Sequence, residues 1–546
     1  MLPGEKKTVT IESVAVGGDG VGRIDGMAVF VPQTCRGDMA EIELTRVKSG
    51  CAYGRVVQIV TPSPHRREGF CPQSTTCGGC NFAHMQYAEQ LAVKRQIVTD
   101  ALQRIGGFTG FEAEPTLAAP RPERYRNKMV FPLGKDAKGR IAGGFYAPGS
   151  HRLVPLTDCR QGDRAAALWL AAVVDFLNEQ HISVYDEGTH RGLARRLFVR
   201  LAEGTREAMV MLTINGKSLK NAHLLVQALR SVQTDYQLKS IILNMHTEAN
   251  NLLLGKTNRV LFGTDRIEDT LGGLRFSVSP HSFYQINAPQ TERLYNTALD
   301  LAALSGQESV LDLYCGIGTI TLFAAAHAAQ VTGVEIVPQA ICDARENAKR
   351  NQIQNASFIC GSAESIAPQL IESGTAPDVV FLDPPRKGAE KAALDAVAHM
   401  APQKIVYISC NPATLARDAA HLARSGYRLC RVIPADMFPN TSHVETVVLL
   451  SKGEIDSKKV RVEFSLEDMD MSGFQKGATY EQIKAYVLEH TGLKVSSLYI
   501  SQIKRKCGLD VGQNYNLSKK EDAKVPKCPP EKEAAIRDAL KYFQMI

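Results

Sequence analysis

Hydrophobic and polar residues alternate along the first 62 residues, where glycine-containing turns separate several short apolar runs. Alternation with a period of two is typical of half-buried strands, and Gly-Asp-Gly and Asp-Gly sequences favour tight turns. This segment therefore predicts a small β-barrel. Its basic residues are compatible with a solvated polar face or with RNA contact, and they are Arg23, Arg36, Arg46, Lys48 and Arg55.

Residues 63–285 mix the two periodicities. The stretch AEQLAVKRQIVTDALQRIG has apolar residues at helical spacing, whereas RRLFVRLAEG and AMVMLTING are typical of strands. This pattern predicts an α+β domain.

From residue 286 to 452 predicted helices and strands alternate, as in a doubly wound α/β domain. The remaining residues are more polar and predict helices, two of them joined by a glycine-containing turn and a last one in PPEKEAAIRDALKYF, where prolines stand at the start. We therefore expect a multidomain α/β protein with four segments. They are a β-barrel (1–62), a central α+β domain (63–285), a Rossmann-like domain (286–452) and a basic, mostly helical extension (453–546).

Composition narrows the class of protein without identifying it. The net charge of +7 is compatible with a polyanionic partner but does not require one. No apolar run approaches the roughly 20 residues of a membrane helix, and the first residues lack the apolar core of a signal peptide. We therefore expect a cytoplasmic protein without a membrane partner. The 13 cysteines are then expected to be reduced thiols or metal ligands rather than disulfides.

Three cysteines stand close together in a glycine-rich loop. Cys71, Cys77 and Cys80 have the spacing C-x5-C-x2-C, which fits an iron–sulfur site better than the paired C-x2-C motifs of structural zinc. Cys159, in a polar turn after a predicted strand, is the best remote fourth ligand. Four unrelated thiols remain the alternative, and the spacing is compatible with [2Fe-2S] as well as [4Fe-4S].

The sequence VLDLYCGIGTITLFAA predicts a strand, a turn and a helix start, but Gly316 and Gly318 supply only part of a dinucleotide motif. Glu335 ends the next predicted strand, where an acid accepts hydrogen bonds from ribose hydroxyls. Glu364 follows the third strand and Asp383 the fourth. A nucleoside ligand is therefore predicted. A phosphate-binding Rossmann enzyme is the rival, but the third glycine of that motif is missing.

Cys410 stands where the apolar stretch KIVYI ends before Asn-Pro. A free cysteine is often a small buried hydrophobe, but the end of a strand in an α/β sheet is also where ligands bind. A thiolate that adds to carbon 6 of a pyrimidine makes carbon 5 nucleophilic. A base must then remove the carbon-5 proton, and Glu445, with His443 nearby, is the candidate.

The ordered motifs SFYQIN, DLYCGIGT, FLDPPRKG, SCNPATLARD and HVETVVLL resemble those of the RNA uracil-5-methyltransferases. The cysteine set resembles that of the family's iron–sulfur members. The stretch GGDGVGRIDG resembles the TRAM module, a small RNA-binding barrel that these members carry. The resemblance covers residues 1 to about 452 and implies a class I, S-adenosylmethionine-dependent methyltransferase fold.

The resemblance also implies a role for each candidate residue. Cys410 would be the nucleophile and Glu445 the base, so that a buried, inert Cys410 is disfavoured. Gln285, Tyr314, Glu335 and Asp383 would bind the methyl donor, with Asp383 also close to the uracil. The ligands of a [4Fe-4S] cluster would be Cys71, Cys77, Cys80 and Cys159.

The same resemblance favours 23S ribosomal RNA as the substrate. The sequence leaves the oligomeric state open, and we expect a monomer. Methylation of tRNA by the same chemistry is one alternative. A non-catalytic RNA-binding iron–sulfur protein is another, which the presence of Cys410, Asp383 and Glu445 disfavours.

Overall fold

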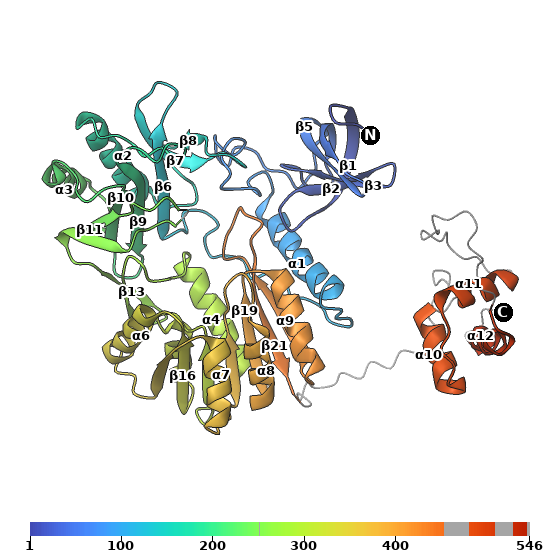
Figure 1. The fold of residues 1–546 in the computed structure, drawn as a ribbon. Helices are drawn as coiled ribbons and strands as arrows, with labels where there is room; N and C mark the ends of the chain where they lie inside the picture. Colours follow the sequence, from blue (N-terminus) through green and yellow to red (C-terminus); the bar gives the residue numbers. More distant parts are fainter. Residues whose placement is uncertain (251, 453–479, 508–527, 543–546) are drawn as a thin grey trace. The chain divides into compact units, whose positions relative to one another are not determined.

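The computed structural model describes residues 1–250, 252–452, 480–507 and 528–542. The chain divides into two units, Met1–Ile455 and Asp456–Ile546. The first unit contains a closed barrel, two seven-stranded sheets and a two-stranded hairpin (Figure 1). No helix within these described ranges is long and apolar enough to cross a membrane.

The N-terminal segment forms the predicted barrel, with strand order β1-β2-β3-β5-β4. Alternate residues such as Val9, Ile11, Ile42 and Leu44 fill its interior, as a period of two requires. Gly22 is needed because a side chain there would collide with the carbonyl of Thr10 on the neighbouring strand. The strands are β1 (Lys6–Val14), β2 (Gly20–Ile24), β3 (Met27–Val31), β4 (Met39–Val47) and β5 (Cys51–Thr61).

A seven-stranded, mostly antiparallel sheet follows, in the order β12-β11-β10-β9-β6-β7-β8. Helices α2 (Arg164–Glu179) and α3 (Ala222–Ser231) share a hydrophobic cluster with one face of this sheet. The hairpin of β13 (Ile267–Leu271) and β14 (Leu274–Val278) packs on the other face. The strands are β6 (Lys128–Lys135), β7 (Ile141–Tyr146), β8 (Leu153–Pro155), β9 (Ala194–Ala202), β10 (Glu207–Ile214), β11 (Gln237–Met245) and β12 (Thr257–Gly263).

The second large sheet has the order β17-β16-β15-β18-β19-β21-β20. The first five of these strands are parallel, whereas β21 runs antiparallel to both of its neighbours. The strands that SVLDLY, QVTGVEI, ASFICG, DVVFLDPP and KIVYISC predict are all present. They are β15 (Ser309–Leu313), β16 (Gln330–Glu335), β17 (Ala356–Cys360), β18 (Val379–Leu382) and β19 (Lys404–Ser409), and β20 (Arg428–Ala435) and β21 (Glu445–Ser451) complete the sheet.

Helices cover both faces of this sheet, which confirms the doubly wound prediction. The two hydrophobic clusters assign α4, α5 and α6 to one face and α7, α8 and α9 to the other. The helices are α4 (Ala288–Ala302), α5 (Thr319–Ala325), α6 (Pro338–Arg350), α7 (Ala363–Glu372), α8 (Lys391–Met400) and α9 (Pro412–Arg424).

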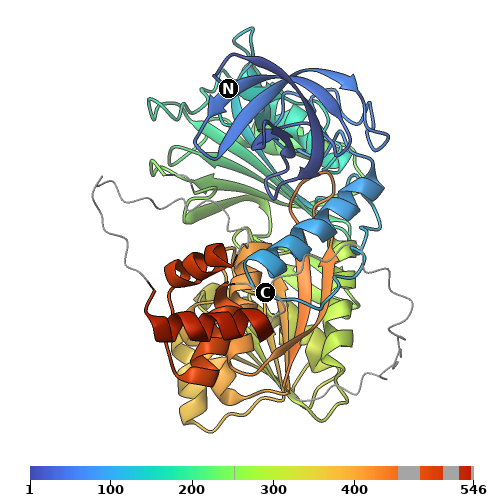
Figure 2. The ribbon, with the colours of Figure 1, turned by 90° about the vertical axis from the view of Figure 1, so that its right-hand side faces the viewer.

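Helix α1 (Tyr87–Arg104) is the helix that the sequence predicts in segment 63–285. Its apolar side chains join the core of the second sheet, and it lies beside α9 and the strands next to it in both views (Figures 1 and 2). Lys94, at its middle, forms a fully buried ion pair with Asp436 and donates to the Phe438 carbonyl at 3.1 Å. Removing one partner of such a pair leaves a buried charge, so the pair holds α1 against the loop between β20 and β21.

The second unit contains three described helices, in agreement with the predicted helices of this region. They are α10 (Tyr480–Thr491), α11 (Ser497–Lys506) and α12 (Pro530–Tyr542). Ile483, Ile500, Ile503 and Ile536 form their shared core. The Ser496 hydroxyl caps α11 by accepting a hydrogen bond from the Tyr499 amide.

Candidate active site and cysteine cavity

The carboxyl ends of parallel strands meet at one edge of a sheet, where ligands bind in doubly wound folds. At this edge Tyr314 follows β15, Glu335 ends β16, Asp383 follows β18 and Cys410 follows β19. Glu445 joins them because β21 is antiparallel and begins at the same edge. Ser409 is paired with Thr446, so the next residues outward, Cys410 and Glu445, lie across from each other.

The turn after β15 has three residues with positive φ, namely Tyr314 (72°), Gly316 (56°) and Gly318 (84°). It directs the Gly316 amide at one carboxylate oxygen of Glu335 (3.2 Å). The other oxygen accepts from the Val337 amide (2.9 Å). The acid is therefore fixed beside the turn.

This turn fits the nucleoside part of a methyl donor. The Glu335 carboxylate has lone pairs left for ribose hydroxyls. Burial, and then the charge of Glu364, raise the pKa of Tyr314, whereas a hydrogen bond from the Glu390 main chain lowers it.

Gln285 and Asp383 both lie close to the buried Tyr295. Burial and the charge of Asp383 raise the pKa of Tyr295, whereas the side chains of Thr319 and Gln285 lower it. The main chain of Gln285 is held by the Asn127 amide, which donates to its carbonyl at 2.8 Å. Tyr314, Glu335 and Asp383 therefore lie at the carboxyl edge of the sheet. Gln285 lies near them, beside Tyr295.

The catalytic candidates form one electrostatic cluster. Burial raises the pKa of Asp383 to about 7. Burial, and then the charge of Asp383, raise the pKa of Glu445 to about 8. Burial raises the pKa of the half-buried Cys410 to about 11, with further contributions from Glu445 and Asp383. A thiol that responds to both carboxylates lies close to them, which is the arrangement that nucleophile and base require.

Two further residues of this site, Arg386 and Asp312, were not predicted from the sequence. The Arg386 guanidinium lowers the pKa of both Cys410 and Glu445, and its position directly after the Asp-Pro-Pro turn was the available signal. Asp312 is an acid inside an apolar strand. Burial raises its pKa to about 7, although it accepts a hydrogen bond from the Thr321 hydroxyl at 2.5 Å.

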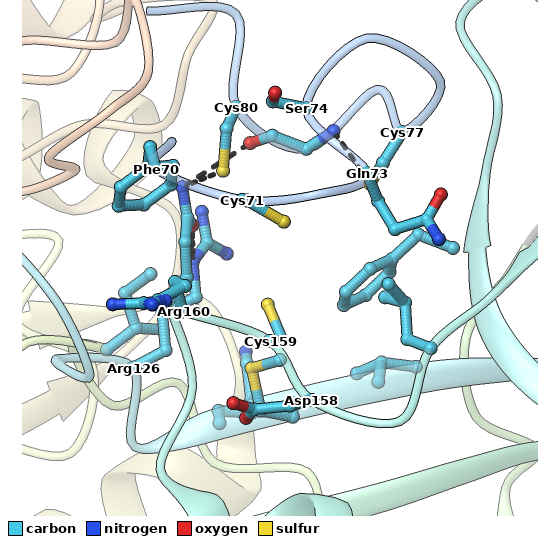
Figure 3. A pocket seen from close by; sticks show the side chains of 18 residues that line it. Phe70, Cys71, Gln73, Ser74, Cys77, Cys80, Arg126, Asp158, Cys159 and Arg160 are labelled. Carbon is cyan, nitrogen blue, oxygen red and sulfur yellow. Dashed lines mark hydrogen bonds between the residues drawn. The ribbon is translucent and has the colours of Figure 1, made fainter. Parts of the chain in front are cut away.

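The four predicted cluster ligands line one cavity of about 280 Å³. The sulfur atoms of Cys71, Cys80 and Cys159 point into the shared space (Figure 3). Burial, and then the charges of Cys159 and Cys77, raise the pKa of Cys80 to about 12. Burial also raises the pKa of Cys77, with smaller contributions from the charges of Cys159 and Cys71. The structure therefore brings together all four cysteines, including the remote one.

Within the described part of the chain, no group of three or more His, Cys, Asp or Glu side chains is arranged around a single metal ion. A [4Fe-4S] cluster spreads its ligands more widely, because each thiolate binds a different iron. The basic residues that line the cavity outnumber its one acidic residue, Asp158, which suits the negative charge of such a cluster; they are Arg126, Lys128 and Arg160. The Gly79 amide donates to the Cys77 sulfur at 3.4 Å. This donor set fits an anionic iron–sulfur cluster.

Comparisons with known proteins agree with this geometry. The family model described as tRNA (Uracil-5-)-methyltransferase matches residues 227–453. The TRAM domain model matches residues 2–57, which confirms the predicted type of barrel.

Two RNA methyltransferases described as uncharacterized are similar over most of their length. The protein of Clostridium tetani is 44% identical over 442 residues, which are 81% of this chain and 95% of that protein. The protein of Halalkalibacterium halodurans is 41% identical, with 81% and 96% covered.

A solved structure resembles the fold. It is the Pyrococcus abyssi tRNA (uracil-54, C5)-methyltransferase in complex with S-adenosyl-L-homocysteine. The TM-score is 0.66 and the identity 27%, over 81% of this chain and all of that one.

The buried carboxyl of Glu445 predicts a stability difference that depends on pH. Its folded-state pKa of about 8 lies above the ordinary value of 4.5, so the folded protein binds more protons and wild-type stability falls as pH rises from about 4.5 to 8. Glu445→Gln carries no such proton. It should unfold at a higher temperature than wild type at pH 8, and the difference should shrink as pH falls towards 4.5.

Thermal unfolding followed by circular dichroism at several pH values measures this difference. Glu372→Gln, at an exposed position at the end of α7, is the matched control and should show no such trend. Equal unfolding temperatures of Glu445→Gln and wild type at pH 8 would contradict the buried, neutral carboxyl.

Proposed function

This chain belongs to the RNA methyltransferases of the uracil-5 family, and we propose that it methylates carbon 5 of a uridine in 23S ribosomal RNA through a covalent adduct on Cys410. The observation that carries the proposal is the convergence of Cys410, Glu445 and Asp383 at the carboxyl edge of the second sheet. S-adenosylmethionine, when bound, supplies an electrophilic methyl group. Gln285, Tyr314, Glu335 and Asp383 would hold it at this edge.

The first proposed step belongs to Cys410. Its thiol is half-buried and gives its proton to water. The thiolate forms a bond to carbon 6 of the uracil, so that the electron pair of the 5,6 double bond becomes available at carbon 5. The pKa of about 11 describes the site without ligands. The guanidinium of Arg386 already lowers it, and a bound sulfonium would add a second positive charge.

The second proposed step belongs to Glu445. After carbon 5 has received the methyl group it carries one hydrogen too many, and a base must remove that proton before the carbon–sulfur bond to Cys410 breaks. Glu445 lies across from Cys410. Its pKa of about 8 leaves a minority of the carboxyl groups ionised at neutral pH, and that ionised form is a stronger base than an ordinary glutamate. The carboxylate takes the proton, the 5,6 double bond reforms and the thiolate leaves.

We further propose that Cys71, Cys77, Cys80 and Cys159 hold a [4Fe-4S] cluster. The support is their convergence on one cavity with three basic side chains. The thiolates of these residues would each bind one iron and so join the loop around residues 71–80 to the turn that contains Cys159. A folding role follows, because ligand binding to such a site is coupled to the order of the loops that supply it.

Two RNA classes compete as substrate. The iron–sulfur set together with the TRAM barrel supports 23S ribosomal RNA by resemblance. The family model, described as tRNA (Uracil-5-)-methyltransferase, and the similar Pyrococcus abyssi tRNA enzyme support tRNA, which is therefore the second candidate.

The barrel offers an RNA-binding surface for either substrate. Phe30 and Tyr53 stack with ring centres 5.5 Å apart, and the Lys48 ammonium lies 5.5 Å from the Tyr53 ring. Aromatic and basic side chains together suit unpaired RNA bases. Arg36 and Arg55 are instead paired with Glu89 and Glu43, which lowers their value as phosphate contacts.

Variants of the nucleophile and the base should stop the reaction at different stages. Cys410→Ala should bind RNA but form no methylated product and no covalent complex, because no bond to carbon 6 forms. Glu445→Gln should form the bond and transfer the methyl group, then accumulate a covalent, methylated protein–RNA species. Denaturing gels with radiolabelled methyl donor, on a 23S fragment and on a tRNA transcript, measure both.

The tRNA transcript decides between the two candidate substrates in the same experiment. Accumulation on tRNA alone would replace 23S RNA by the second candidate. A covalent species formed by Cys410→Ala would show that another residue is the nucleophile.

The cluster proposal predicts iron and sulfide in protein purified without oxygen, with a brown colour. Cys80→Ser should lose most of the iron and destabilise the first unit, because one of four thiolate ligands is gone. Cys342→Ser, at an exposed cysteine on α6, is the matched control and should keep the iron of wild type. Metal analysis that finds one zinc per protein, or full iron in Cys80→Ser, would contradict the cluster.

A further inference from the structure

The loop between β20 and β21, residues 436–444, leads directly into Glu445. At its centre Asn440 has a positive φ of 67°, a conformation that non-glycine residues keep only when their surroundings hold it. Its amide donates to the Gln90 side chain at 2.9 Å, and its side-chain amide donates to the Pro122 carbonyl at 2.9 Å. The side-chain oxygen accepts from Arg67. The loop before the base is thus fixed by contacts from outside the sheet.

Residues next to Cys80 supply more of these contacts. Asn81 and Ser442 are joined twice, since the Ser442 amide donates to the Asn81 side-chain oxygen and the Asn81 amide donates to the Ser442 hydroxyl, both at 2.9 Å. The Phe82 amide donates to the Asn440 carbonyl at 3.0 Å. Asn81 also donates to the Gly17 carbonyl of the barrel at 2.9 Å. The two residues that follow Cys80, Asn81 and Phe82, therefore hold residues 440–442 by hydrogen bonds.

Gln161 connects the cysteine cavity to the same loop from a second direction. It is 3% exposed, and its amide nitrogen donates to the Cys80 sulfur at 2.8 Å and to the Pro439 carbonyl at 3.3 Å. Its oxygen accepts from Arg126 at 2.6 Å and from the Tyr125 hydroxyl at 3.2 Å. Tyr125 donates to Pro439 as well, at 3.1 Å. Every polar atom of this buried amide is used, so its position is determined by its partners.

We propose that Gln161 is a positioning residue for the methylation reaction, which makes the placement of Glu445 depend on the filled cysteine cavity. The inference rests on the proposed function. The path runs from the Cys80 sulfur through Gln161 to Pro439, and in parallel from Asn81 to Ser442, three residues before the base. When Cys80 is held, both connections fix the loop. When the cavity is empty, the Cys80 loop loses its anchor and Glu445 loses its defined distance to carbon 5.

The physical reason for a catalytic effect is the distance dependence of proton transfer. A general base acts within hydrogen-bond reach of the proton that it removes, and a displacement of about 1 Å at the reacting atoms can reduce a rate about 100-fold. Cys410 is positioned by β19 and by α9, whose cap residue Asn411 bonds to the Arg386 carbonyl. The path through Gln161 does not include these elements. Bond formation to carbon 6 should therefore survive when release of the product fails.

The variant Gln161→Met tests this, because methionine keeps the length of the side chain and removes its hydrogen bonds. We expect wild-type iron content, wild-type affinity for S-adenosylmethionine and normal adduct formation, but release of methylated RNA about 10- to 100-fold slower. The methylated covalent species should then accumulate, as with Glu445→Gln. Gln73→Met is the matched control. Gln73 lines the same cavity, but its side-chain oxygen accepts a hydrogen bond from Thr76 within its own loop, so product release should match wild type.

Hydrogen exchange gives a readout that does not depend on turnover. The Asn440 and Ser442 amides, which donate to Gln90 and Asn81, should be protected in the cluster-loaded protein. Peptides that span 437–445 should exchange faster in Gln161→Met and in protein whose cluster has been removed with a chelator. Gln73→Met should retain the protection.

The outcomes separate this inference from the proposed function. Failure of Glu445→Gln to accumulate adduct would overturn the proposed function, whereas unchanged exchange in 437–445 after cluster removal would overturn the coupling alone. Normal product release by Gln161→Met would also overturn it. Loss of iron from Gln161→Met would assign Gln161 to cluster retention and would contradict a positioning role.

Discussion

The burial of two carboxyl groups beside a thiol, at one edge of a parallel sheet, is the constraint around which the rest of the first unit is arranged. Asp383 and Glu445 each raise the pKa of Cys410, and burial raises their own pKa values to about 7 and 8. In water such groups would be charged and would repel one another. The fold holds them together because each stands at the end of a strand whose pairing is fixed elsewhere.

Such an arrangement needs supports on the side away from the sheet. The antiparallel strand β21 presents Glu445 at its first residue, where pairing begins. The preceding loop is therefore held by other elements: by α1 through Lys94 and Asp436, and by the cysteine region through Gln161 and Asn81. These supports explain why residues 278 to 361 positions apart in the chain meet at one loop. Through the coupling that we infer, the proposed cluster would affect the reaction without direct contact with the substrate.

Much of the fold was predictable because local patterns determine it. The barrel strands, the doubly wound alternation and the strand-end positions of Glu335, Asp383 and Cys410 all follow from periodicity and turn residues. The convergence of Cys159 with Cys71, Cys77 and Cys80 was predicted from spacing and resemblance together. Residues close in sequence carry most of this signal, and only the addition of the remote Cys159 depended on the resemblance.

The remaining features depend on contacts between distant residues. The amphipathic pattern of α1 predicts a helix but not which sheet it covers, and the buried Lys94 finds its partner 342 residues later. Arg386 lowers the pKa of Cys410 and of Glu445, and the sequence alone does not reveal that it lies near these two residues. Gln161 is an ordinary polar residue until the structure places Cys80 and Pro439 on its two sides. The periodicity of a sequence cannot predict contacts between residues so far apart in the chain.

The most direct test of the account is the identity of the RNA that Glu445→Gln captures covalently in cells. The variant is expressed without the wild-type protein, purified under denaturing conditions, digested with ribonuclease and protease, and analysed by sequencing and mass spectrometry. The account predicts a fragment of 23S RNA whose 5-methyluracil is bonded to the peptide that contains Cys410. An adduct on another residue, or no covalent RNA at all, would contradict it.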